Sequence, residues 1–293
     1  MKLKLEDVCE RGSSSLKQSD ILGMTGDYPI YGASGYIGNV DFYHQEKPYV
    51  AIVKDGAGIG RTTFHTAKSS VIGTMQYLLP KDNVLPKYLY YVVGHMHLEK
   101  YFSGATIPHI YFKDYKSEEF NYDSLDKQKN IVEILGRCEK EISARKRELE
   151  LLDSLIKARF VEMFGDVKYG SERWGGKPFK DITINLDSKR KPVKDADRKR
   201  MQGIYPYYGA TGIVDYINDY RQDGDFLLIS EDGKALELRS KPIAFLASGK
   251  IWVNNHAHVQ QCTDECNMIY LMYHINFMDI SIWVTGIDQK KLN

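Results

Sequence analysis

The sequence lacks the features of several specialised protein classes. No apolar run approaches the roughly 18 residues that a membrane-spanning helix needs, and residues 1–7 carry no apolar core of a signal peptide. The four cysteines, at positions 9, 138, 262 and 266, are too few and too scattered for a disulfide framework in a chain of 293 residues. These absences predict a cytoplasmic protein with reduced thiols and no membrane partner.

An excess of charge of one sign is also absent. Lys and Arg number 40 and Asp and Glu 39, so the formal net charge of +1 provides no global field to attract a polyanion. One dense basic run lies between Asp187 and Arg200. Such a run is either a solvated loop or a clamp for phosphates, and composition leaves the two interpretations about even. Its candidate phosphate contacts are Lys189, Arg190, Lys191, Arg198, Lys199 and Arg200.

Common catalytic signatures are missing. The sequence has no Gly-x-Ser-x-Gly, no His-Glu-x-x-His and no Asn-Pro-Pro-Tyr/Phe, the last being a signature of adenine methyltransferases. The glycine-rich stretch 56–61 lacks the spacing of a nucleotide-binding loop, which favours a hairpin connection. Asp232-Gly233-Lys234 has the acid-x-Lys ending of one nuclease site, but no Pro-Asp precedes it at a suitable distance. The chain is therefore predicted to be non-catalytic.

A metal site is disfavoured as well. His256, His258, Cys262 and Cys266 offer two imidazoles and two thiols, the ligand types of a tetrahedral zinc site. Alternation along a strand, with both histidines on one face, accounts for the histidine pair without a metal. We therefore predict no metal, and we treat the two histidines as candidate contacts to base edges or phosphates.

The sequence does contain a long internal repeat. Residues 28–35, Tyr-Pro-Ile-Tyr-Gly-Ala-Ser-Gly, recur at 205–212 as Tyr-Pro-Tyr-Tyr-Gly-Ala-Thr-Gly, an offset of 177 positions. Asp55-Gly56 recurs at that offset, whereas Tyr88-Leu89 recurs as Tyr270-Leu271 and Ser103-Gly104 as Thr285-Gly286 at an offset of 182, as a few inserted loop residues would produce. The repeat is too long for a solenoid unit and indicates a duplicated domain.

The two copies are assigned to residues 1–122 and 166–293. In the first copy, runs rich in β-branched and aromatic residues predict strands over 49–53 and 71–79. A helix is predicted over 88–102, after a proline and before a glycine. Each copy is thus expected to be a mixed domain of strands and helices.

A different pattern occupies residues 123–165, between the copies. Ten positions from 131 to 163 alternate steps of four and three residues, and eight of them are apolar, which is a heptad seam. The stretch predicts one helix of roughly 60 Å, at about 1.5 Å per residue. It is either a core helix of one globular domain or a spacer, and its length, its seam and the duplicated flanks favour the spacer. The predicted fold is α+β, with two similar mixed α/β domains separated by a long coiled-coil-forming helix.

These motifs resemble a known family in their order along the chain. The repeated stretches at 28–35 and 205–212, Ser-Gly-Ala-Thr-Ile-Pro at 103–108 and Leu-Asp-Lys-Gln at 125–128 resemble type I restriction–modification specificity (S) subunits. The resemblance implies two target-recognition domains that each read one half of a bipartite DNA target, with the helices between them as a ruler for the unread spacer. It also implies assembly with methyltransferase (M) subunits and restriction (R) subunits. S-adenosylmethionine, ATP and Mg²⁺ would belong to those partners, and no cofactor is expected on this chain.

The chain departs from the family at its end. We expect the distal helix, which follows the second recognition domain in the family, to be missing after Asn293. The apolar seam of the central helix is then expected to pair with the same helix of a second chain as a homodimer, with another S polypeptide, or with an M subunit. The seam residues that we expect at this interface are Ile131, Leu135, Ile142, Leu149, Leu152 and Ile156.

Candidate base contacts follow from residue chemistry. Arg and Lys suit guanine, Asn and Gln suit adenine, and Ser and Thr suit either. In the first copy the candidates are Ser34, Tyr36, Lys54, Arg61, Thr74, Gln76 and Thr106. In the second copy they are Thr211, Lys234, Asn254, His256 and His258. The alternatives to a specificity subunit are a truncated, dimerising DNA-binding protein or scaffold without restriction–modification activity, and a metal-dependent nuclease with its site near Asp232 and Lys234.

Overall fold

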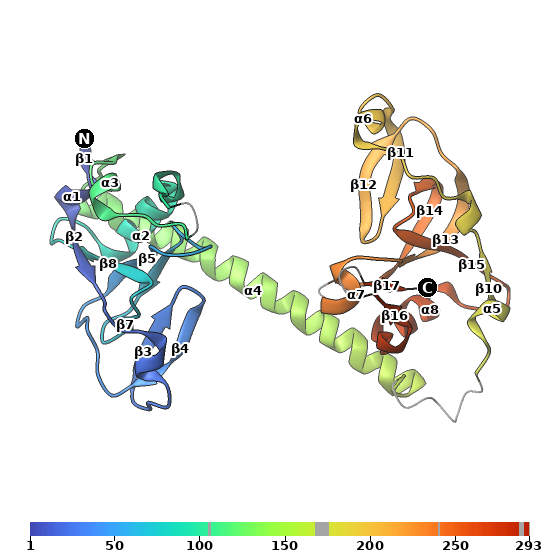
Figure 1. Cartoon of the computed structure of the whole chain (residues 1–293), viewed down its shortest axis with the longest axis horizontal. Coiled ribbons are helices and arrows are strands. Elements are labelled where there is room, and N and C mark those ends of the chain that lie inside the picture. Colours follow the sequence, from blue (N-terminus) through green and yellow to red (C-terminus); the bar gives the residue numbers. More distant parts are fainter. Residues whose placement is uncertain (105–106, 168–175, 240, 287–289, 293) are drawn as a thin grey trace. The chain divides into compact units, whose positions relative to one another are not determined.

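The computed structural model describes residues 1–104, 107–167, 176–239, 241–286 and 290–292. The chain divides into two compact units, Met1–Lys146 and Arg147–Asn293, which we call the N-terminal and C-terminal units (Figure 1). Both units mix strands and helices, and both contain part of one long helix, α4 (Leu125–Phe164). The predicted fold class is therefore confirmed, whereas the domain limits at 122 and 166 stay predictions.

The N-terminal unit is built mainly on antiparallel strands. Its four-stranded sheet has the order β2 (Cys9–Ser13), β8 (Met75–Pro80), β5 (Tyr49–Val53) and β6 (Thr62–His65). A smaller sheet has the order β4 (Gly35–Val40), β3 (Tyr28–Gly32) and β7 (Ser70–Val71), and β1 (Lys2–Lys4) pairs with β9 (Glu119–Asn121). The one parallel pair among the described residues of this unit is β3 with β7. The other helical segments are α1 (Leu5–Val8), η1 (Gln18–Ile21), α2 (Pro86–His95), η2 (Leu98–Tyr101) and α3 (Phe112–Tyr115).

Strand β5 lies at the centre of the N-terminal unit because all five of its side chains are apolar. Every residue of Tyr49–Val53 is buried, so both faces of the strand are covered. On one face Val50 packs in a cluster with Leu89 of α2, and on the other Tyr49 packs with Tyr77. The prediction of a strand over 49–53 is confirmed.

The C-terminal unit repeats this plan in one larger sheet. The six strands have the order β10 (Thr183–Asn185), β15 (Ala257–Cys262), β13 (Gln222–Ser230), β14 (Ala244–Val253), β11 (Gln202–Gly209) and β12 (Gly212–Ile217). A further pair is formed by β16 (Val284–Thr285) and β17 (Lys291–Leu292). The helical segments are α5 (Phe179–Ile182), η3 (Asp187–Lys189), α6 (Asp195–Arg198), α7 (Lys234–Leu238), α8 (Met268–Phe277) and η4 (Ser281–Trp283).

The internal repeat extends through the fold of both units. Helices α2 and α8 have equal lengths and lie 182 positions apart at both ends. The parallel pairing of Ile30 with Ser70 recurs as that of Tyr207 with Trp252. The change of offset falls between β5 and β6 and between their counterparts in β13 and β14, where the C-terminal unit alone has the short helix α7. The inserted loop residues that the sequence predicts therefore form a helix.

The repeated motif forms the same hairpin in each unit. It joins β3 to β4 and β11 to β12, and the closing pairs are Gly32 with Gly35 and Gly209 with Gly212. Gly35 has φ +112° and Gly212 has φ +129°, a conformation that residues with a Cβ rarely adopt. The sequence similarity thus marks a tight turn whose backbone requires glycine.

Two shorter elements differ from the prediction. The strand predicted over 71–79 is interrupted by a turn between β7 and β8. The helix predicted over 88–102 begins at Pro86, ends at His95 and is followed by His97 with φ +53° before η2. The break turns the chain so that Leu98 is buried in the core of the unit, a tertiary contact that outweighs local helix propensity.

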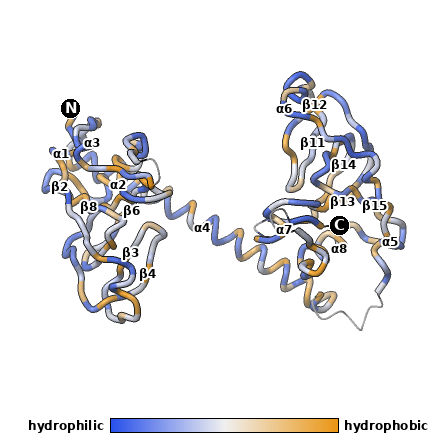
Figure 2. The backbone as a smooth tube through the Cα atoms, in the orientation of Figure 1, coloured by the Kyte–Doolittle hydropathy of each residue, from blue (hydrophilic) through white to orange (hydrophobic). Residues whose placement is uncertain are grey.

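Helix α4 lies within the predicted range 123–165, so the prediction of one long helix is confirmed. Its start is held by Gln128, which is buried and donates from Nε2 to the carbonyl of Asp123 at 2.8 Å. Its end is anchored by Phe160, whose ring stacks on Tyr270 of α8. Polar and apolar residues alternate along it (Figure 2). No helix among the described residues is both long and apolar enough to cross a membrane.

Candidate functional site

The hairpin motif presents polar side chains to solvent in both units. Ser34 and Thr211, at equivalent positions in the two turns, are exposed. Tyr36 is also exposed, and its hydroxyl donates to Asn39 Oδ1 at 3.0 Å. These three candidates from the sequence therefore lie exposed at or next to the turns of the hairpins.

The glycine-rich stretch 56–61 is a hairpin connection between β5 and β6. Gly56 has φ +88° and Gly60 has φ +80°, and the Gly60 amide donates to the Val53 carbonyl at 2.9 Å. Arg61 is exposed beside a cavity of about 790 Å³ between this loop and α2. The predicted turn is confirmed, and Arg61 is accessible to a ligand.

The remaining described candidates of the N-terminal unit lie at the ends of the central strands. Lys54 is half-buried, with its Nζ 2.5 Å from Asp55 Oδ2. Thr74 is half-buried, and Gln76 is buried with only 5% of its surface exposed. Gln76 and Lys54 line one small cavity with His109. Thr106 lies outside the described residues.

The basic run 187–200 divides into two groups of side chains. Lys189, Lys191, Lys199 and Arg200 are exposed. Arg190 and Arg198, in contrast, point into the protein and hold the loop in place.

Both inward arginines form ion pairs. Arg190 pairs with the carboxylate of Glu231 and donates from Nη1 to the Ala257 carbonyl at 3.0 Å. Arg198 pairs with Asp195 and donates from Nη1 to the Val193 carbonyl at 3.1 Å. The two interpretations of the basic run, a solvated loop or a phosphate clamp, therefore concern only Lys189, Lys191, Lys199 and Arg200. Arg190 and Arg198 have a structural role, because they hold the loop against the protein.

The candidates of the C-terminal unit also differ in accessibility. Lys234 is exposed at the start of α7, and His256 is partly exposed with its Nδ1 2.7 Å from Asp232 Oδ2. Asn254 is buried, and its Oδ1 accepts from the His256 amide at 2.8 Å. Asn254 therefore orients the loop that carries His256.

His258 belongs to an internal network of charges. Its Nδ1 lies 2.7 Å from Asp187 Oδ2 and its Nε2 lies 3.0 Å from the Leu292 carbonyl oxygen. Burial opposes the charged imidazole, but the bonds to Asp187 and Leu292 and the charge of Glu231 outweigh it and raise the pKa of His258. Both ring nitrogens are engaged, so a contact from His258 to DNA would require this network to open.

The sequence did not identify the full network. Glu231 is buried and accepts from Lys291 Nζ at 2.8 Å, in addition to its pair with Arg190. Burial would raise the pKa of Glu231, but these two cations lower it overall. The residues of this network come from segments that are distant in sequence, so no local pattern marks them. One sequence signal was available: at the positions of Glu231 and His258, the first copy of the repeat has Lys54 and Gln76.

The seam of α4 is largely exposed. Ile131 is half-buried against the core of the N-terminal unit. The other five predicted interface residues, Leu135, Ile142, Leu149, Leu152 and Ile156, are exposed. Near the end of the helix, Ile156, Phe160 and Tyr273 of α8 line an apolar cleft of about 690 Å³. An apolar stripe of this kind is typical of a surface that another helix covers.

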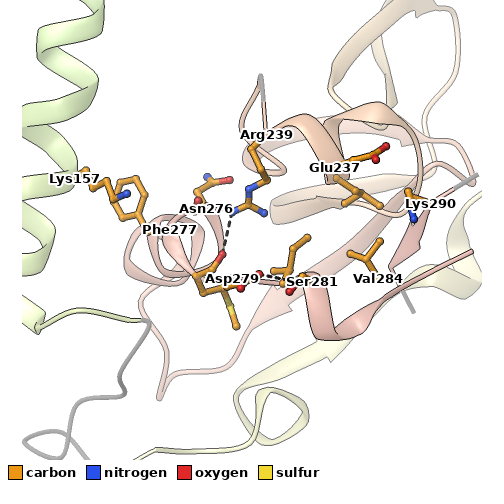
Figure 3. Close-up of a pocket in the computed structure, with 12 residues that line it drawn as sticks. Lys157, Glu237, Arg239, Asn276, Phe277, Asp279, Ser281, Val284 and Lys290 are labelled. Carbon is orange, nitrogen blue, oxygen red and sulfur yellow. Dashed lines mark hydrogen bonds between the residues drawn. The ribbon is translucent and has the colours of Figure 1, made fainter. Parts of the chain in front are cut away.

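A second hollow of the C-terminal unit lies beside the C-terminal end of α8. It has a volume of about 560 Å³ and lies among α7, α8 and η4, with Lys157 of α4 at its rim (Figure 3). Arg239 donates from Nη2 to the carbonyls of Asn276 at 2.7 Å and Met278 at 3.1 Å. The guanidinium thus satisfies carbonyls at the C-terminal end of α8, where helical partners are lacking.

No group of three or more His, Cys, Asp or Glu side chains that could hold a metal ion occurs within the described parts of the chain. Asp232, which the sequence offers as a nuclease carboxylate, pairs with His256. The backbone of Gly233 has φ +99° and begins α7, as the turn interpretation of this stretch predicts.

The comparisons with known proteins agree in one description. A family model described as the type I restriction modification DNA specificity domain matches residues 1–152 and 172–293. A type I restriction enzyme specificity subunit of Haemophilus influenzae is 38% identical over 124 residues, which cover 42% of this chain and 31% of that protein. A type I restriction enzyme specificity subunit of Methanocaldococcus jannaschii is 28% identical over 93 residues, covering 30% of this chain and 22% of that one.

A solved structure shares the fold. The S subunit of a type I restriction–modification system from M. genitalium matches with a TM-score of 0.60 and 15% sequence identity. The match covers 94% of this chain and 77% of that one. The matched residues therefore cover less than a third of the length of each curated relative. The structural match covers most of the solved S subunit.

Proposed function

Because the chain belongs to the type I restriction–modification DNA specificity domain family, we propose that it is the non-catalytic DNA-specificity subunit of such a system. Each copy of the duplicated domain would read one half of a bipartite DNA target. The observation that carries the proposal is the recurrence of one hairpin, with an exposed polar tip, in both units. A duplicated reader suits a target that has two parts.

In this proposal the contacts to DNA divide into two kinds. The exposed residues Lys189, Lys191, Lys199 and Arg200 would contact phosphates and position the protein, because phosphate contacts carry no sequence information. The exposed hairpin residues Ser34, Tyr36 and Thr211, together with Arg61, Lys234 and His256, would contact base edges. The two sets of base contacts differ between the units, which predicts two unlike half-sites.

Helix α4 would set the length of DNA between the half-sites and dock the partner subunits. Its exposed seam would be covered by a helix of an M subunit, of a second S polypeptide or of a second copy of this chain. M subunits would supply S-adenosylmethionine and R subunits would supply ATP and Mg²⁺, so that methylation and cleavage occur on the partners. Such a complex would act on DNA in the cytoplasm.

The exposed seam also favours a second candidate function. A protein that dimerises through α4 and binds DNA without restriction–modification activity would present the same apolar stripe. The two candidates differ in what the chain binds: the specificity subunit requires an M subunit for a stable DNA complex, whereas the dimer does not.

Selection from a randomised duplex pool tests the proposal. The chain is purified with its cognate M subunit, and bound DNA is sequenced after selection at two salt concentrations. Enrichment of a two-part sequence with an unread gap is expected, with affinity that falls as salt rises because phosphate contacts release counterions. Failure of an intact complex to enrich any sequence would contradict the proposal. Enrichment by the chain alone as a dimer would support the second candidate.

A further inference from the structure

The two units can be compared position by position around the end of their central strand. The Ile110 amide donates to the Lys54 carbonyl at 3.0 Å, and the Leu292 amide donates to the Glu231 carbonyl at 2.8 Å. A second pair of backbone bonds also matches: the Lys54 amide donates to the Thr74 carbonyl at 3.0 Å, and the Glu231 amide donates to the His256 carbonyl at 2.9 Å. Lys54 and Glu231 are therefore equivalent positions.

The same equivalence extends to the neighbouring side chains. Gln76 and His258 occupy matching positions of β8 and β15, and His109 matches Lys291. The units thus place different side chains on one shared backbone frame.

In the C-terminal unit this place is filled by paired charges. The carboxylate of Glu231 sits between Arg190 and Lys291, and His258 is held by Asp187. Every one of these charges has a partner of the opposite sign within the protein, so the site needs no ligand.

In the N-terminal unit the same place is a cavity of about 270 Å³. A cation, Lys54, stands where the C-terminal unit has its central carboxylate. Arg11 and His109 also line the cavity, and the described lining includes no carboxylate. Asp55, which lies outside this lining, pairs with Lys54 and His109 and balances only part of the positive charge.

A buried donor at this cavity has no partner. Gln76 is 5% exposed, and its Nε2 has no hydrogen-bond partner among the described residues. An unsatisfied buried amide is unfavourable, and its presence calls for a group that would accept from it. Ser13 and Ser14 line the same cavity and offer hydroxyl donors.

We propose that this cavity is a binding site for a phosphate group or a similar oxyanion, held by Arg11, Lys54 and Gln76 with help from the two serines. The ligand would supply the negative charge that Glu231 supplies within the C-terminal unit. Oxyanion atoms accept hydrogen bonds from amide, hydroxyl and cationic donors alike, which is the donor set present here. The cavity is large compared with the roughly 30 Å³ that a water molecule occupies in the liquid, so it has room for a tetrahedral anion.

The site is tested with inorganic phosphate on the full chain. The melting temperature is measured at rising phosphate concentration, with chloride replacing phosphate at constant ionic strength as the reference. Wild type is expected to show a phosphate-dependent rise, because a ligand that binds only the folded state stabilises it. No phosphate-specific rise in wild type would overturn the proposal.

Three variants locate the response. Gln76→Leu removes the unpartnered amide and is expected to fold at least as stably as wild type. Its dissociation constant for phosphate is expected to rise by about tenfold or more. Arg11→Gln changes an exposed residue and is expected to weaken binding similarly. Lys47→Gln removes an exposed positive charge that does not line the cavity, and should respond as wild type does. Equal responses in all four proteins would overturn the proposal.

A further measurement identifies the source of the phosphate group. Binding of a mixed-sequence duplex by the chain in complex with its M subunit is measured with and without phosphate at constant ionic strength. Competition by phosphate in wild type, and its loss in Gln76→Leu, would assign the cavity to a backbone phosphate of DNA. Phosphate binding without competition would assign it to a free oxyanion. The melting measurement needs no DNA, so its failure would leave the proposed specificity function untouched.

Discussion

The exposed seam of α4 makes a quantitative prediction about assembly. The triple substitution Leu149→Ser, Leu152→Ser and Ile156→Ser removes three apolar side chains from the stripe. In the chain alone these residues are 63%, 47% and 40% exposed, so a covering helix would bury the equivalent of about one and a half further side chains. The folding of the isolated chain should change little, because these side chains contribute little to its core.

The expected loss of association follows from that area. Full burial of an aliphatic side chain contributes roughly 1.5–3 kcal/mol, so the triple variant should lose about 2–4 kcal/mol per helix. For a partner helix that carries no substitution, this corresponds to roughly a 30- to 1,000-fold rise in the dissociation constant, and in a homodimer, where both helices carry the substitutions, the loss of free energy doubles. Helix pairs of this type depend on the a and d positions, so the effect should be confined to the seam.

The assay is sedimentation of the purified chain over a range of concentrations, alone and with the M subunit. Leu151→Ser is the matched control, because Leu151 is 60% exposed but lies off the seam. The triple variant should dissociate at concentrations where wild type and the control remain associated. If the three proteins associate equally, or if wild type stays monomeric and does not bind the M subunit, the seam is not an interface and the reasoning fails.

Three further predictions concern the C-terminal unit, whose unfolding can be followed alone by tryptophan fluorescence because residues 1–146 contain no tryptophan, whereas Trp252 and Trp283 lie in the C-terminal unit. Arg190→Ala should lower the free energy of unfolding by about 3 kcal/mol, because it leaves the buried carboxylate of Glu231 with one cation fewer to balance its charge. Lys199→Ala, at an exposed residue, should change the free energy of unfolding by no more than about 0.5 kcal/mol. Equal effects of the two substitutions would contradict the claim that Arg190 stabilises the fold whereas Lys199 is only exposed. Phe160→Ala should lower the free energy of unfolding by about 3–5 kcal/mol, because the ring is buried against α8, and an unchanged urea midpoint would refute this anchor. The folded pKa of His258 is raised, so its contribution to stability is complete below its ordinary pKa of 6.5 and is lost as pH rises through the higher folded pKa. His258→Gln should flatten the dependence of the unfolding free energy on pH above 6.5, and an unchanged slope would show that another group is responsible.

The main outline of the fold was predictable because the chain repeats its own sequence. The hairpin motif was detectable because a tight turn with positive φ requires glycine at Gly35 and Gly212, which limits the residues that can stand there. The long helix was detectable because an exposed seam repeats regularly and contains no proline. Both signals are local, and local signals can be read directly from a sequence.

The details of the candidate sites depended on contacts between distant segments. His258 was chosen as a base contact for its chemistry, but its partners Asp187 and Leu292 lie 71 and 34 positions away and hold it inside the unit. Gln76 was chosen for the same reason and is buried. Alternation along a strand predicts which residues share a face, but not which face is covered.

The break in the predicted helix 88–102 has a similar cause. Propensity favours continuation, but burial of Leu98 in the core requires the chain to turn at His97. The free energy that decides the local conformation comes from packing elsewhere in the unit.

The central claim is that two domains read two half-sites and that α4 sets the gap between them. Insertion of one heptad into α4, between Lys146 and Arg147, tests it most directly. Seven residues add about 10.5 Å at nearly the same helical phase, which corresponds to roughly three base pairs at about 3.4 Å each. Selection from the randomised pool with the M subunit should then return the wild-type half-sites separated by a longer gap. Altered half-sites, or an unchanged gap, would contradict the claim.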